Sequence, residues 1–286
     1  YILTNHLDKF SAANQARYKT VINRAATFCV NYHVSDIYTN IRIVNASNLI
    51  LLGEALNRSD LAEAGYERLN WFYLYTIQYG LREYTSPSYY GVDYEGLASI
   101  YCHTTSAKAK AQSEALLKYL WTDIEANWFD PAKRISGARS RQVYDFMQGG
   151  GALDVYLWSK GLLDAEPALY VQCIMAAQFN WEIPESIINL GLSYPRYVKQ
   201  KWGYSHRETR TSYILPDIAL GTAAAPYSGQ EVNLAVDFTG GYRTPRMVFV
   251  PDGYGDPFML KNWPNNSAYH HFQAWVTAAQ ESTDAL

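Results

Sequence analysis

The pattern of apolar residues changes near residue 204, and this change constrains the fold more than any other feature of the sequence. Before it, apolar residues recur at helical spacing, as the leucines of segment 45–57 do. After it, apolar alternation and β-branched runs are separated by Gly, Pro and Asp, a pattern typical of strands. The strand-like segments cover residues 208–223, 231–238 and 246–253. We therefore predict a helical domain over residues 1–203 and a β-rich domain over residues 204–286.

The helical part contains recognisable boundaries. Ser59 is a preferred N-cap residue and Gly80 a preferred C-cap residue, which predicts a helix over 59–80. Further helices are expected over residues 106–129, 151–164 and 167–181. Short connections favour antiparallel neighbours. The predicted fold is mainly α with a β part: an (α/α) toroid or incomplete barrel of helical hairpins, followed by the start of an antiparallel β-sandwich. A helical solenoid is the alternative, but the sequence has no fixed repeat.

Composition and motifs exclude several classes of function. The net charge of -3 and the pI near 6.1 give no basic footprint, so we expect no nucleic-acid partner. No apolar run reaches the roughly 20 residues of a spanning helix, so we expect no membrane segment. Phosphate-loop, zinc-protease and serine-hydrolase motifs are absent, and the three cysteines match no metal motif. We therefore expect neither metal nor cofactor.

Tyrosine is unusually abundant, with 25 residues against 10 phenylalanines. A phenol combines an apolar face with a hydroxyl, which suits a wet cleft that stacks on sugars. Partly buried tyrosines in a helical array are the other explanation. Three N-glycosylation sequons begin at Asn45, Asn57 and Asn265, and the chain starts without Met. We expect a secreted glycoprotein whose β domain is completed by a further segment or chain.

The first candidate site is "EYTSPSYYGVDYEGL", residues 83–97. Ser-Pro should hold the chain extended before a helix that starts near Asp93. We expect Tyr90, or alternatively Tyr89, to present a hydroxyl at the rim of the helical barrel, whereas packing explains Tyr84 and Tyr94. The other explanation is that Tyr89 and Tyr90 also pack between helices.

The second candidate is "YTNIRIVNASN", residues 38–48, where Asn40, Arg42 and Asn45 lie at the start of a helix. Amide and guanidinium groups together are suited to grip a carboxylate. The alternative is ordinary helix capping by the asparagines, with the Arg42 side chain solvated. A glycan on Asn45 would exclude that residue from a site.

Two further segments supply cationic candidates. Arg139, Arg141 and Tyr144 lie in a Gly- and Ser-rich connection and suit an anionic sugar, with solvated surface charge as the alternative. His206 precedes Arg207 and Arg210 at the predicted domain junction, a favoured place for a ligand site.

A helical histidine and a group of acids are further candidates, and each also has a structural explanation. His103 lies on a helix, where a lone histidine is more often structural. The acids Glu83, Asp93 and Glu95 provide carboxylates for glycoside hydrolysis, although capping also explains Asp93.

Three of these segments together resemble polysaccharide lyases of the heparinase and alginate-lyase type. Residues 83–97 are similar to the Ser-Pro-x-Tyr segment of that family, residues 38–56 to its Asn segment followed by a Leu- and Gly-rich helix, and residues 208–223 to the first strand of its β domain. The chain departs from the family pattern because Ile41 and Gly91 stand where His is common.

The resemblance implies β-elimination at a uronic acid in an anionic polysaccharide. In that mechanism Asn40 neutralises the carboxylate, Tyr90 or Tyr89 acts as acid or base, and His206 or His103 is its partner. Arg42, Asn45, Arg139, Arg141 and Tyr144 would bind substrate. A glycoside hydrolase and a non-catalytic carbohydrate-binding protein are the competing interpretations.

Overall fold

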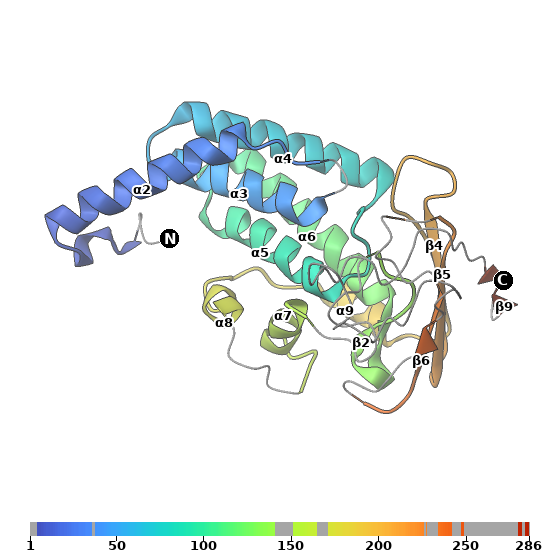
Figure 1. Ribbon diagram of the computed structural model, residues 1–286. Coiled ribbons are helices and arrows are strands. Elements are labelled where there is room, and N and C mark those ends of the chain that lie inside the picture. The colour runs from blue at the N-terminus through green and yellow to red at the C-terminus, as the bar shows by residue number, and fades with distance from the viewer. Residues whose placement is uncertain are drawn as a thin grey trace, which may run out of the picture. The chain divides into compact units, whose positions relative to one another are not determined.

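A computed structural model describes residues 5–35, 38–140, 151–164, 171–225, 227, 234–241, 247–248, 280–281 and 284–285 (Figure 1). The chain divides into two compact units that alternate along the sequence. The first unit comprises residues 1–78, 93–117 and 177–182, and the second comprises residues 79–92, 118–176 and 183–286. This division does not follow the boundary predicted at residue 204.

The described helices and strands confirm a mainly α protein with a β part. The helices are η1 (Leu7–Lys9), α2 (Ala12–Asn31), α3 (Thr39–Ala55), α4 (Ser59–Tyr79), α5 (Pro87–His103), α6 (Ala107–Ala126), η2 (Asp130–Ala132), α7 (Leu153–Ser159), α8 (Val171–Ala176) and α9 (Glu185–Leu192). The strands are β1 (Trp128–Phe129), β2 (Arg134–Ile135), β3 (Arg196–Lys201), β4 (Thr209–Ile214), β5 (Ile218–Ala223), β6 (Leu234–Phe238), β7 (Met247–Val248), β8 (Gln280–Glu281) and β9 (Asp284–Ala285). The arrangement of the helical hairpins as a toroid stays a prediction.

Helices of the first unit approach one another closely where one of them carries glycine. A Cβ atom on Gly53 of α3 would lie 2.4 Å from the backbone nitrogen of Ala62 on α4. A Cβ atom on Gly96 of α5 would lie 2.5 Å from the side chain of Ile43 on α3. There is no room for a side chain at either position. Glycine therefore allows α3 to pack directly against α4 and α5.

Helix α5 begins earlier than the sequence pattern predicted. Pro87 is its first residue, a position where the missing backbone N–H is not needed. The predicted start near Asp93 is therefore wrong, and Tyr89 and Tyr90 lie in the first turn. Tyr84 and Tyr94 are fully buried, which confirms that these two tyrosines serve packing. Gly80 follows α4 with φ +83°, as expected for a helix C-terminus.

The sheet of the second unit is an antiparallel meander in the order β3-β4-β5-β6-β7. Figure 1 labels its strands β4, β5 and β6. Strands β4, β5, β6 and β7 fall within the three segments predicted from alternation. Strand β3 was missed and begins at Arg196, before the predicted boundary. The helix predicted over 106–129 ends at Ala126, because Trp128 and Phe129 pair with Ile135 and Arg134 across a tight turn.

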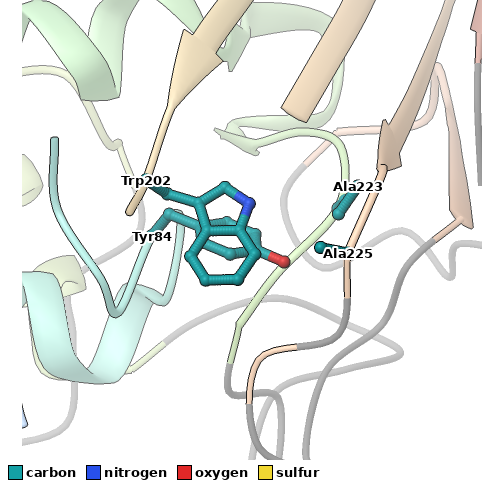
Figure 2. Packing of buried hydrophobic residues seen from close by; sticks show 5 residues of the cluster. Tyr84, Trp202, Ala223 and Ala225 are labelled. Carbon is teal, nitrogen blue, oxygen red and sulfur yellow. The ribbon is translucent and has the colours of Figure 1, made fainter. Parts of the chain in front are cut away.

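The meander packs against the preceding chain through aromatic rings. The ring centroids of Tyr84 and Trp202 are 5.1 Å apart, and both side chains are fully buried (Figure 2). Ala138, Ala223 and Ala225 complete this cluster. The small alanines leave space for the two large rings. Within the described part of the chain, no helix is long and apolar enough to cross a membrane.

Candidate functional site

A cavity of about 190 Å³ lies in the first unit, where the chain leaves α2. Its lining residues come from the end of α2 and the following loop, from α3 and from α4. They are Tyr32, His33, Val34, Arg42, Asn45 and Arg68. We call this cavity the guanidinium pocket. Two arginines, an amide, an imidazole and a phenol therefore form its polar wall.

Arg68 is held by neutral oxygens. Its Nη1 donates to the carbonyl of Cys29 at 2.9 Å and to Oδ1 of Asn45, and its Nη2 donates to the carbonyl of Val30 at 2.7 Å. Asn45 in turn donates from Nδ2 to the carbonyl of Cys29 at 3.0 Å. These bonds fix the guanidinium against the last turn of α2. Among the described residues none of its hydrogen-bond partners carries a negative charge.

Arg42 is fixed in a different way. Its Nε donates to the carbonyl of Ser35 at 3.3 Å, and its guanidinium carbon lies 3.9 Å from the centroid of the Trp71 ring. This distance is well inside the range of a cation–π contact. The aromatic face adds an electrostatic contact to the cation.

The electrostatics of the pocket favour an anion. Burial and the nearby charge of Arg42 both lower the pKa of Arg68. Arginine stays protonated at neutral pH. The two guanidinium groups therefore repel each other, which is energetically unfavourable. An anionic group bound between them would relieve that repulsion.

The structure brings together some of the predicted residues of the second candidate segment. Arg42 and Asn45 both line the pocket. Asn40 is buried in the first turn of α3 and is not part of the lining. His33, Tyr32 and Arg68 were missed. Arg68 lies within a predicted helix, and nothing local in the sequence indicates that this helix faces Asn45.

Tyr90 lies in a buried polar cluster of the second unit. Its hydroxyl donates to Oδ2 of Asp123, and Oδ1 of the same carboxylate accepts from Arg210 and from Gln200. Asn127 also donates to that oxygen, at 3.2 Å. Tyr90 has no exposed surface, and the exposed fractions of Asp123 and Arg210 are 2% and 5%. We call these five residues the Asp123 cluster.

The Asp123 cluster disfavours ionisation of Tyr90. Burial and the charge of Asp123 raise its pKa well above the ordinary value, and the opposing effect of Arg210 is smaller. The phenol therefore stays protonated at any physiological pH. It is also out of reach of solvent, contrary to the expectation of a hydroxyl at a cleft rim. We infer that Tyr90 stabilises the second unit.

The remaining candidates lie in varied surroundings. Arg139 is fully buried and donates from Nη2 to the carbonyl of Ile135 at 2.7 Å, so it is not a solvated loop charge. Tyr89 and His103 are half-buried, and burial lowers the pKa of His103. His206 is exposed between β3 and β4. Arg141 and Tyr144 lie outside the described residues.

The carboxylates considered for glycoside hydrolysis are poorly accessible. Glu83 and Asp93 are fully buried, and Glu95 is half-buried. A sugar would have no direct access to the first two. Across the described ranges, no group of three or more His, Cys, Asp or Glu side chains has the arrangement of a metal site.

Fold and cavity define a mainly helical protein with an antiparallel meander and a pocket rich in guanidinium groups. The chain belongs to the family described as a domain of unknown function, DUF8769, whose model matches residues 5–182. All residues of the guanidinium pocket lie inside this range. No curated protein and no solved structure matches the chain.

Proposed function

We propose that the protein binds a uronic-acid-containing polysaccharide in the guanidinium pocket and cleaves it by β-elimination. The observation that carries the proposal is the position of Arg68, a cation whose described hydrogen bonds all go to neutral oxygens and which faces the charge of Arg42. A sugar carboxylate has the charge and the paired oxygens that such groups bind best.

The pocket supplies the groups that β-elimination requires. Arg42 and Arg68 neutralise the carboxylate, which stabilises the charge that develops when the C5 proton leaves. Asn45 keeps Arg68 in place. His33 accepts the C5 proton, the C5–H electron pair forms the C4–C5 double bond, and the C4–O4 bond breaks. The Tyr32 hydroxyl donates a proton to the leaving O4.

In this mechanism His33 and Tyr32 take the acid–base roles that the sequence predicted for Tyr89 and Tyr90. His33 and Tyr32 are both exposed, so a polymer can reach them. Tyr90 is buried and its pKa is raised, so it is suited to neither role. The resemblance to heparinase-type and alginate-type lyases supports the reaction class, and the pocket supports the location.

The test combines binding and turnover on alginate, glucuronan, heparin and chondroitin sulfate. We expect at least one polymer to bind and to yield a product that absorbs in the near ultraviolet because of its new double bond. Arg42→Gln and Arg68→Gln should each weaken binding about tenfold or more, since each removes a charged hydrogen-bond donor. His33→Gln should abolish turnover while leaving binding nearly unchanged.

Arg58→Gln is the matched control. Arg58 is bonded to Asp60 and Asn23 and lines a different cavity of the first unit, so its loss should not change binding. Equal binding by Arg68→Gln and the wild type, with the fold verified by circular dichroism, would contradict the proposal. Binding without any unsaturated product would leave a non-catalytic carbohydrate-binding protein, which the same pocket supports.

A further inference from the structure

Two exposed aromatic side chains continue the guanidinium pocket along the surface of α2. Tyr32 lines the cavity, and Phe28 lies one helical turn before it. Their ring centroids are 5.7 Å apart with an interplanar angle of 22°. Their exposed fractions are 46% and 66%. The two rings thus form a continuous apolar surface that starts inside the cavity and ends outside it.

This surface is not explained by the packing of α2. Ala26 is the buried residue of that helix, so its aromatic side chains contribute little to the core. Phe28 and Cys29 are neighbours, yet Cys29 packs against the core cluster of Ala26, Leu49 and Leu61, whereas Phe28 points to solvent. Exposed apolar surface beside a cavity is a feature of ligand-binding sites, and here the two stacked rings adjoin the guanidinium pocket.

We propose that Phe28 and Tyr32 form a second sugar subsite, which holds the residue adjacent to the uronate bound by Arg42 and Arg68. The inference rests on the proposed function. A pyranose has an apolar face of C–H groups that stacks on aromatic rings, while its hydroxyls stay in water. A cationic cavity joined to an aromatic surface matches an anionic saccharide chain, and a small inorganic anion would use the cavity alone.

The test compares one sugar residue with four. Glucuronate and mannuronate are titrated as monosaccharides and as β-1,4-linked tetrasaccharides, and cellotetraose serves as the uncharged chain. The wild type should bind a uronate tetrasaccharide about tenfold or more tighter than its monosaccharide, and cellotetraose weakly. Phe28→Ala should remove most of that gain and leave the affinity for the monosaccharide unchanged.

Phe10→Ala is the matched control. Phe10 stacks on Tyr18 at 6.3 Å and is 41% exposed, so it is a similar aromatic pair away from the pocket. It should not affect binding. The molecular mass in solution is measured for each variant, because a dimer of the wild type that dissociates in Phe28→Ala would make the rings a contact between two copies and overturn the inference.

The outcomes separate this inference from the proposed function. Monosaccharide binding that depends on Arg68, combined with full tetrasaccharide affinity in Phe28→Ala, refutes the second subsite alone. Failure of every uronate to bind, or binding that Arg68→Gln leaves intact, refutes the pocket and the subsite together.

Discussion

Arginine is used in opposite ways in the two units. In the second unit Arg210 is buried and shares the Asp123 carboxylate with Tyr90 and Gln200, so its charge is neutralised inside the protein. In the first unit Arg68 is only partly buried, and its described hydrogen bonds go to carbonyl and amide oxygens. Arg210 is therefore neutralised within the fold, whereas none of the described hydrogen-bond partners of Arg68 carries a negative charge.

The partner and the exposure of a polar residue therefore decide whether it stabilises the fold or is available to a ligand. A buried ion pair is expensive to break, because the remaining charge keeps its desolvation penalty. An oriented arginine beside solvent contributes less to stability and more to ligand affinity. Changes in the Asp123 cluster should therefore alter unfolding, and changes in the guanidinium pocket should alter binding.

The largest effect is expected for Asp123→Ala. It leaves Arg210 buried without its carboxylate, and the free energy of unfolding should fall by about 3–5 kcal/mol. Urea unfolding followed by circular dichroism measures the loss. Asp60→Ala, which breaks the exposed pair with Arg58, should change stability little. Equal losses in the two variants would remove the distinction between the Asp123 cluster and a surface ion pair.

The next effect depends on pH and concerns Glu125, a second buried carboxylic acid of the second unit. Burial raises the pKa of Glu125 to about 8, and Arg196 offsets only part of the increase. The carboxyl group of an unfolded glutamate has a pKa near about 4.3. Between about pH 4.3 and pH 8 the folded state therefore holds a proton that the unfolded state has lost. The free energy of unfolding decreases as pH rises through this range. Glu125→Gln should flatten this slope and be more stable than the wild type at about pH 9, where the wild-type carboxylate is buried and charged.

Glu54 of the first unit provides the control with the opposite sign. Burial alone would raise its pKa, but hydrogen bonds from Thr104, Tyr66 and Thr105 outweigh burial and lower it. Its contribution is present above the unfolded pKa and disappears as pH falls through the folded pKa. Glu54→Gln should therefore be destabilised at neutral pH and approach the wild type in acid. The same pH slope in both variants would contradict this assignment.

The smallest effect is expected for Tyr90→Phe. Loss of one hydrogen bond to Asp123 should lower the free energy of unfolding by about 1–2 kcal/mol, with binding and turnover unchanged. Tyr213→Phe, at a half-buried strand position in the same unit, should be neutral. Turnover lost in Tyr90→Phe while the fold stays intact would restore Tyr90 as a catalytic residue.

Local patterns in the sequence predicted several of the helices and strands and part of the pocket. Helical spacing before residue 204 and alternation after it predicted α4, β4 and β5, because periodicity depends on neighbours along the chain. Arg42 and Asn45 were predicted together because both lie at the start of one predicted helix, and their i, i+3 spacing places them on one face of α3.

Tertiary structure alone decided which groups complete the pocket and which are hidden. Arg68 reaches Asn45 from a different helix, and His33 lines the same cavity from a loop. Asp123 and Arg210 come to the buried Tyr90 from distant segments of the chain. No local pattern specifies such pairings, since they depend on the packing of glycine-lined helices and on strand register. The same residue types therefore predicted a site at Tyr90, where the fold places a buried cluster, and gave no signal at Arg68, where it opens a cavity.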